Sequence, residues 1–343
     1  KILELSTIHD RPTEDSFCRL INFREDWHLF AYRHGFFRLE DPLAIKDMIE
    51  ECNGDYSVNK FDLFDRITQN IASKGWTDIE RDYYELLKKN AESIEVCKRL
   101  NDQMKFAKEK LAEYLSTIQQ PNTKETIKKA LDSPIYRDDV STHELKRKEN
   151  ELKDIPEEEF IKIEGSSDIS YGFVENTMLL NFNYTPTAEM YLEESIRVNY
   201  IHGSLGKPNE MIFGYGDEMD KDFKDLENRN ENALLENSKS IKYLETSHYR
   251  YLLSFIEGGP FQVYIMGHSC GNSDRTLLNT IFEHQNCISI KPFCYINEKG
   301  EDNYSELTRN IYRNFTDKKL FRDRVVNKER CTTLDGRPLI NKE

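Results

Sequence analysis

The sequence has few of the features that mark membrane or secreted proteins. No apolar run comes near the roughly 20 residues that a membrane-spanning helix requires. The opening residues, from Lys1 to Leu5, contain no small-residue cleavage site of the kind that ends a secretory signal. We therefore expect a cytoplasmic protein without a membrane partner.

Cysteine pairs and standard phosphate-binding strings are also missing. The seven cysteines are odd in number and scattered, and none forms a Cys-x-x-Cys pair. Disulfide frameworks and zinc sites both need regular spacings, so we expect reduced thiols and no metal. The absence of a Walker A string argues against a P-loop nucleotide site.

Basic side chains are outnumbered by acidic ones, and aromatic side chains are plentiful. The 343 residues include 62 acidic and 48 basic side chains, for a net charge of -14. Such a field repels phosphate backbones, so we do not expect nucleic acid as a partner. The 19 Phe and 18 Tyr residues predict a packed core, because a disordered chain would be poor in them.

The residue pattern divides the chain into three regions. Residues 1–75 give an unclear, mostly helical pattern. Residues 76–165 predict a helical insertion. Residues 166–343 alternate strands with helices, which predicts an α/β domain with a mostly parallel sheet. A chain of this length accommodates about two domains.

The helical insertion carries the longest apolar stripe of the sequence. Thr77 is the predicted N-cap, with Glu80 as its capping-box partner, and the stripe ends near Pro121. The pattern fits one long helix or two helices with a tight break. In the third region, strands are expected at 178–182, 197–201, 211–215, 261–266 and 287–296, and helices at 240–256, 275–282 and 306–315.

Three loops rich in small and polar residues follow predicted strands, at 183–187, 202–206 and 267–274. In open α/β sheets, ligands bind beyond the carboxyl ends of the strands. His202 titrates near neutrality and is a ready general base, and Gly203 beside it would let a ligand approach the backbone. Each loop alone also fits a purely structural role, capping a strand or the next helix.

The loop 267–274 supports two interpretations. Its backbone amides and the following helix N-terminus would hold an anion such as a pyrophosphate. It also matches Gly-x-Ser-x-Gly, in which Ser269 would be the nucleophile of a hydrolase. Such enzymes place their His after the Ser, and only His284 follows, about 15–20 Å away along the next helix. A nucleotide site is therefore favoured over a serine hydrolase.

Five short segments, at 76–80, 182–185, 201–204, 267–274 and 322–328, occur in an order that resembles the AbiH family of bacterial abortive-infection (anti-phage) proteins. That family is similar to sirtuin-like NAD-binding domains. The resemblance implies a Rossmann-like, mostly parallel sheet with a large helical insertion, and NAD as substrate or ligand.

The same resemblance implies roles for individual residues. Asn183 falls on the Asn that binds the nicotinamide ribose, and His202 falls on the general base of a His-Gly motif. The other residues expected to contact the nucleotide are Tyr184, Thr185, Gly203, Ser204, Gly267, His268, Ser269, Gly271 and Asp274. Two parts have no match: the zinc ribbon of sirtuins, and the Gly-Asn-Gly-Phe-Asp loop that the family carries near its N-terminus.

Two functions follow from this resemblance. The favoured one is a defence effector, an NAD glycohydrolase that cleaves the nicotinamide–ribose bond with water. The alternative is a non-catalytic module that senses a small-molecule nucleotide or binds a partner. In that case, the helical region 76–120 offers a surface for a second copy of the chain or for a defence-system partner protein.

Overall fold

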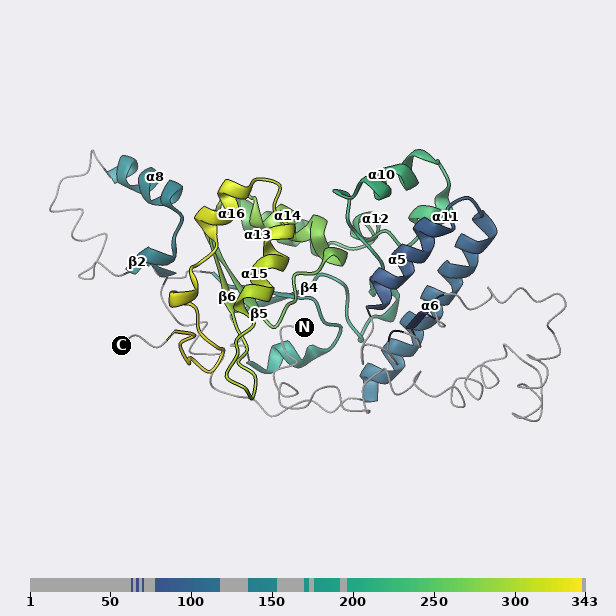
Figure 1. Ribbon diagram of the computed structural model, residues 1–343, viewed down its shortest axis with the longest axis horizontal. Helices are drawn as coiled ribbons and strands as arrows, with labels where there is room; N and C mark the ends of the chain where they lie inside the picture. Colours follow the sequence, from purple (N-terminus) through teal and green to yellow (C-terminus); the bar gives the residue numbers. More distant parts are fainter. Residues whose placement is uncertain are drawn as a thin grey trace.

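The computed structural model describes residues 63, 66, 67, 70, 78–117, 135–152, 170–172, 176–191 and 196–340. The prediction for residues 1–75 therefore lies almost wholly outside the described residues. Helices predominate in the part described, and the strands are short (Figure 1). None of the described helices combines the length and apolar character that crossing a membrane requires.

The helical insertion begins with two helices rather than one. Helix α5 spans Ile79–Lys89 and α6 spans Ile94–Thr117, with a four-residue turn between them. The N-cap of α5 is Asp78, whose side chain accepts from the backbone N–H of Arg81. The predicted capping box of Thr77 and Glu80 is therefore wrong, because Asp78 is the residue that accepts from the unpaired backbone N–H of the first turn.

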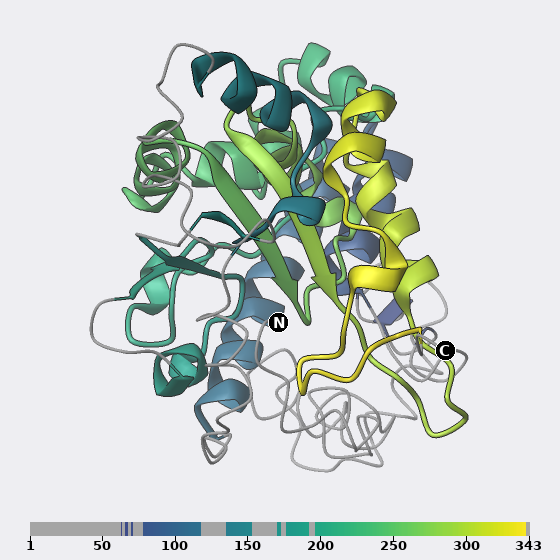
Figure 2. The same cartoon turned by 90° about the vertical axis from the view of Figure 1, so that its left-hand side faces the viewer.

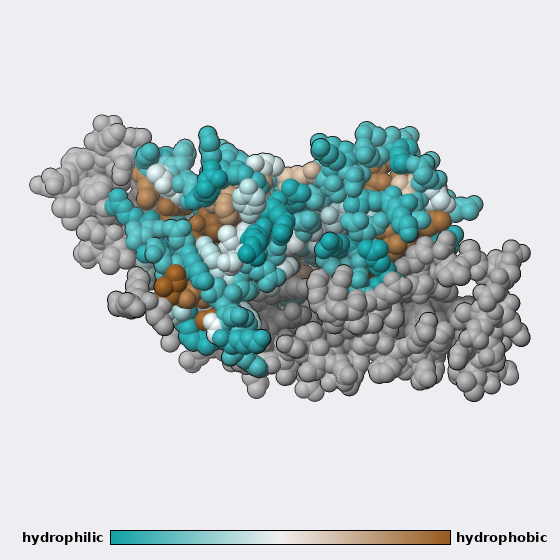
Figure 3. Space-filling view, viewed as in Figure 1, coloured by the Kyte–Doolittle hydropathy of each residue, from teal (hydrophilic) through white to brown (hydrophobic). Residues whose placement is uncertain are grey.

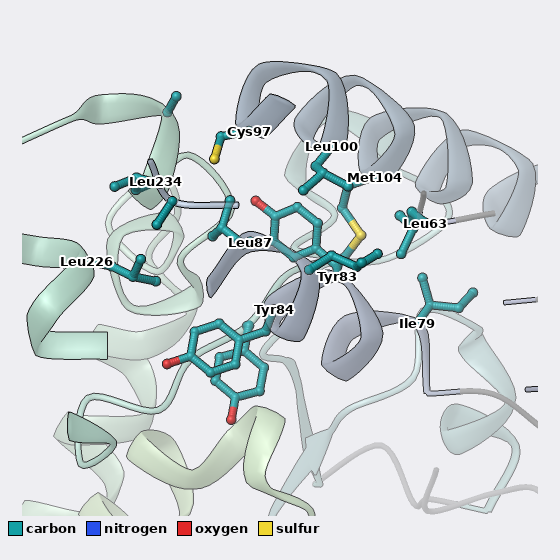
Figure 4. Close-up of a cluster of buried hydrophobic side chains, with 14 of the residues drawn as sticks. Leu63, Ile79, Tyr83, Tyr84, Leu87, Cys97, Leu100, Met104, Leu226 and Leu234 are labelled. Carbon is teal, nitrogen blue, oxygen red and sulfur yellow. The ribbon is translucent and has the colours of Figure 1, made fainter. Parts of the chain in front are cut away.

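These two helices pack against α10 (Lys221–Asn228) and α11 (Asn232–Leu235). Figure 4 shows Tyr83 between Leu87 and the pair Leu100 and Met104 of α6, in a core from which water is excluded. The rings of Tyr84 and Tyr215 stack nearly parallel, with centroids 3.7 Å apart. This first core therefore joins the insertion to a segment far along the chain.

The second core surrounds two pairs of parallel strands. Strand β3 (Met178–Asn181) pairs with β4 (Arg197–Tyr200), and β5 (Phe261–Met266) pairs with β6 (Cys287–Phe293). Figure 2 shows β5 and β6 side by side, with the C-terminal helices along one side. The surrounding helices are α12 (Lys239–Lys242), α13 (His248–Glu257), α14 (Arg275–Phe282), α15 (Tyr304–Arg313) and α16 (Lys318–Arg324).

The mixed α/β class and the parallel pairing are confirmed, but a single Rossmann-like sheet is not observed within the described residues. The strands there form three separate pairs, the third being β1 (Ile135–Tyr136) antiparallel to β2 (Ser170–Gly172). Helix α8 (Thr142–Leu152) follows β1, and its first N–H groups are capped by Asp323. The face drawn in Figure 3 is mainly hydrophilic, with small separate hydrophobic patches.

The strand predicted at 211–215 is wrong. Ile212 donates to the carbonyl of His202, whereas Tyr215 donates to the carbonyl of Asn237. The segment thus bonds to two different neighbours and makes only an isolated bridge at Tyr215. A side chain on Gly214 would lie 2.0 Å from the Asn237 carbonyl oxygen, so glycine permits this close crossing.

The helix predicted at 240–256 is divided into α12 and α13. His248 donates its backbone N–H to the Thr246 hydroxyl at the division, the local bond by which Thr competes with a helix. The helix at 275–282 is confirmed, and α15 lies within two residues of its prediction. Helix α16 was missed, although Asp317 caps it. Strand β6 ends three residues before predicted.

Candidate functional site

The loops that follow β3, β4 and β5 come together at the carboxyl ends of these strands. The Phe182 ring lies edge-on to the His202 ring, with centroids 5.4 Å apart, and tilted against the His268 ring at 4.2 Å. His202 in turn lies 3.3 Å from Asp274, through its Nε2. Residues predicted from three separate loops thus share one neighbourhood, as parallel strands favour.

The first loop is shaped by Asn181, a residue that the sequence did not single out. Its buried side chain accepts from the backbone N–H of Asn183 at 2.9 Å and donates to the carbonyl of Thr185 at 3.3 Å. Tyr184 is buried and donates its hydroxyl to the carbonyl of Ile212 at 2.7 Å. Asn183 and Thr185 remain half-buried. Asn181 therefore fixes the turn that presents Asn183.

The second loop turns at Gly203, which has a φ of +79°. A side chain there would lie 2.3 Å from the backbone oxygen of Glu210, so the chain itself fills the space beside this glycine. His202 is 4% exposed and half-buried Ser204 follows. Gly203 thus permits a close backbone crossing that holds His202 inside the protein.

The third loop has its strained residue at Cys270, not at Ser269. Cys270 is buried with a φ of +53°, a conformation that side chains other than glycine seldom adopt. Its backbone N–H donates to Nδ1 of His268 at 3.0 Å, and its carbonyl accepts from Asn314 at 2.9 Å. Gly267 and Ser269 are exposed, and Gly271 is half-buried.

This geometry bears on the Gly-x-Ser-x-Gly interpretation. In a nucleophile elbow the Ser itself occupies the strained position and faces a His. His284 instead lies 3.3 Å from Glu257 and accepts from the backbone N–H of Asn286. It is therefore engaged elsewhere, and the geometry offers it no role as the base for Ser269.

A buried charge cluster lies beneath the three loops. It comprises Glu80, His202, Lys239, His268 and Asp274. Lys239 Nζ lies 2.8 Å from Asp274 Oδ1 and 2.8 Å from Glu80 Oε2. His202 Nε2 lies 3.3 Å from Asp274 Oδ1, and His268 Nε2 lies 3.5 Å from Asp274 Oδ2. Asp274 is therefore the common acceptor of one ammonium and two imidazoles.

The cluster shifts the pKa of its members in different directions. Burial would raise the pKa of Asp274, but Lys239 and His202 hold it well below its usual range. Burial and the neighbouring Lys239 lower the pKa of His202, so its imidazole is neutral at physiological pH. The pKa of Lys239 is raised, because the attraction of Asp274 and Glu80 outweighs burial.

Glu80 shows the opposite behaviour to Asp274. Burial, only partly offset by Lys239, raises its pKa to about 7. Its other oxygen accepts from the backbone N–H of Gly214 at 3.1 Å. The Lys239 ammonium thus pairs with two carboxylates, and Asp274 stays ionised to a lower pH than Glu80.

Sequence reasoning missed Glu80, Lys239 and Tyr243 as members of this neighbourhood. The Tyr243 hydroxyl lies 3.2 Å from His202 Nε2. Glu80 belongs to the 76–80 segment of the family resemblance, which was the one signal available for it. Lys239 gave no signal, because Lys is almost never fully buried, yet here it is 1% exposed.

Metal ligation is not supported by the described part of the chain. No group of three or more His, Cys, Asp or Glu side chains there is arranged to hold a metal ion. Lys239 lies against the carboxylate on which the two imidazoles converge, and a cation already occupies that position. The cluster is therefore suited to proton transfer and charge stabilisation by its own side chains.

Comparison with known proteins gives one match. The family model described as bacteriophage abortive infection AbiH matches residues 35–295, well over half of the chain. The matched range contains all five members of the buried charge cluster. Neither the curated proteins nor the solved structures include a match.

Proposed function

This chain belongs to the AbiH family of bacteriophage abortive-infection proteins, and we propose that it acts in that defence by hydrolysing NAD at the nicotinamide–ribose bond. The observation that carries the proposal is His202. It is a neutral imidazole at the carboxyl end of a parallel strand, next to the loops of Asn183 and Ser269. A neutral imidazole accepts a proton, which is what activation of water requires.

Cleavage of this bond needs little covalent chemistry from the protein. The carbon–nitrogen bond breaks, its electron pair leaves with nicotinamide, and a water oxygen bonds to the ribose carbon through an oxocarbenium-like transition state. His202 takes the proton that the water or a ribose hydroxyl gives up. The products are nicotinamide and ADP-ribose, so the atoms balance with water as the sole co-reactant.

Other residues of the three loops fit the remaining parts of NAD. Within the described part of the chain, the side chain of Asn183 makes no hydrogen bond, so it is available to position ribose or water. The backbone amides of 267–271 would hold phosphates, apart from that of Cys270, which donates to His268. Gly267 and Ser269 are exposed there, whereas the charge cluster lies beneath.

The proposal is tested by incubating the purified full chain with NAD and following nicotinamide release by chromatography. We expect release that falls by about 10²-fold or more in His202→Ala, the size of effect seen when a general base is lost. His284→Ala is the matched control, since His284 also lies close to a carboxylate, 3.3 Å from that of Glu257, but belongs to another part of the fold. Unchanged turnover in His202→Ala contradicts the assignment.

A second candidate is a nucleotide-sensing module without catalysis. The observation that favours it is the 4% exposure of His202, because a substrate must reach this side chain for chemistry to occur. Calorimetry with NAD and with ADP-ribose separates the two functions. Tight binding of both without nicotinamide release supports the sensor, and release dependent on His202 excludes it.

A further inference from the structure

We propose that Asp274, which pairs with Lys239, fixes His202 in the tautomer protonated at Nε2, so that Nδ1 is the nitrogen that accepts a proton. The assignment of Nδ1 rests on the proposed function, whereas the tautomer is a property of the protein alone. Asp274, Lys239 and Glu80 are thus positioning residues, which act on the reaction through His202.

The geometry around Asp274 sets the direction of each hydrogen bond. An ionised carboxylate has no proton to donate and only accepts. Asp274 Oδ1 accepts from Lys239 Nζ at 2.8 Å and faces His202 Nε2 at 3.3 Å. A lone pair at Nε2 would be repelled by the carboxylate oxygen, so this nitrogen carries the proton. A neutral imidazole has one N–H, which leaves the lone pair at Nδ1.

Tyr243 is compatible with this assignment. Its hydroxyl oxygen lies 3.2 Å from His202 Nε2, and a hydroxyl accepts as readily as it donates. Burial raises the pKa of Tyr243 well above its usual range, so the phenol stays neutral. The groups that face His202 are therefore one carboxylate, one phenol, the Lys239 ammonium and the His268 imidazole.

His268 supplies an independent reference in the same cluster. Its Nδ1 accepts from the backbone N–H of Cys270 at 3.0 Å, so its proton must be on Nε2. That nitrogen faces the other oxygen of Asp274 at 3.5 Å. The tautomer of His268 is thus set by the backbone, whereas that of His202 is set by Asp274.

Lys239 links the two carboxylates of the cluster. It is 1% exposed, and its ammonium donates to Asp274 and to Glu80 of helix α5. Without this cation, the two carboxylates would repel each other, and Glu80, whose pKa is already raised to about 7, would take a proton before Asp274. Asp274 would still accept from His202, so Lys239 acts on His202 mainly through its positive charge, which lowers the pKa of His202.

The experiment is NMR of the full chain with nitrogen-labelled histidine, in which long-range correlations report the protonated ring nitrogen. At neutral pH, we expect the Nε2–H form for both His202 and His268. In Asp274→Leu, no carboxylate faces His202 Nε2 and the Tyr243 hydroxyl can donate to it, so His202 loses its preference for the Nε2–H form, while the Cys270 N–H keeps His268 in that form. A wild-type His202 in the Nδ1–H form, or a His202 tautomer that Asp274→Leu leaves unchanged, overturns the proposal.

A second variant tests the role of Lys239 while the Asp274 carboxylate stays in place. Lys239→Met removes the cation that lowers the pKa of His202, so that pKa should rise in the NMR titration. Lys291→Met is the matched control, since Lys291 pairs with the buried Asp139 at 2.7 Å, outside the cluster. A His202 titration that is the same in both variants overturns the role of Lys239.

The same variants distinguish this inference from the proposed function. For nicotinamide release, we expect a loss of about 10²- to 10⁴-fold in Asp274→Leu, the range for a general base whose tautomer is no longer fixed. If NMR shows the expected tautomer but NAD is not cleaved, the proposed function is contradicted and the tautomer assignment stands. If NAD cleavage depends on His202 but NMR shows His202 in its Nδ1–H form, the inference is contradicted and the proposed function stands.

Discussion

The helical region and the α/β region bury charge in different ways. The core around α5 and α6 is mainly apolar, and its buried charges form separate pairs, Asp82 with Arg66 and Lys110 with Glu113. The loops at the ends of β3, β4 and β5 instead hold most of a connected charge cluster, to which the helical region contributes Glu80. The difference indicates that the linked titratable groups gather where the two regions meet.

The largest expected effect comes from removing the cation at this junction. Lys239→Met removes the cation that Glu80 and Asp274 share, so we expect the free energy of unfolding to fall by about 3–5 kcal/mol at neutral pH. Chemical denaturation measures the change. A loss below about 1 kcal/mol would mean that water or rearrangement already compensates these charges.

A matched pair of core truncations compares the two regions directly. Leu100 in α6 and Leu277 in α14 are both 1% exposed, so each Leu→Ala change should cost about 2–5 kcal/mol. Helix α14 begins directly after Asp274, so only Leu277→Ala should also alter the NMR signal of His202. Equal changes of the His202 NMR signal in both variants would contradict this distinction between the two regions.

Glu80→Gln tests how the buried charge cluster makes the free energy of unfolding depend on pH. The pKa of Glu80 is raised from 4.5 to about 7, so the native state holds this proton more tightly than the unfolded chain. Its stabilising contribution is full below about pH 4.5 and is lost as the pH rises through 7. Denaturation over this range should therefore show a downward slope with pH that Glu80→Gln lacks.

Subtracting the two stability curves isolates Glu80 from other groups. Asp274 acts with the opposite sign, because its pKa is depressed: its contribution is present above its unfolded pKa and is lost as the pH falls through the folded one. We expect the difference between wild type and variant to reach about 2–3 kcal/mol across the window. A flat difference would show that Glu80 ionises normally in the folded protein.

The smallest effect is expected for a polar pair at the edge of the helical region. Tyr84 donates its hydroxyl to Asp220 at 3.1 Å while its ring stacks on Tyr215. Tyr84→Phe keeps the stacked ring and removes the hydrogen bond, so thermal denaturation should report a loss of about 1 kcal/mol. A loss as large as that of Leu100→Ala would mean that this region depends on polar contacts after all.

The sequence predicted features that depend on local pattern. Strands β3 and β5 and helix α14 follow from apolar runs and caps, and the meeting of His202 and Asp274 follows from where parallel strands end. The segment 211–215 misled because its apolar run bonds to two separate neighbours, which no local pattern records. Glu80 and Lys239 escaped notice because charged residues on helices are normally solvated.

The position of Lys239 has a consequence for the cooperativity of unfolding. Lys239 and Asp274 both belong to the α/β region, so opening that region would leave Glu80 without its cation, whereas opening the helical region would remove only Glu80 and leave the pair of Lys239 and Asp274 intact. The helical region therefore depends on this junction more than the α/β region does. Local opening of helix α5 would uncover the cluster while Asp274 keeps its ammonium partner.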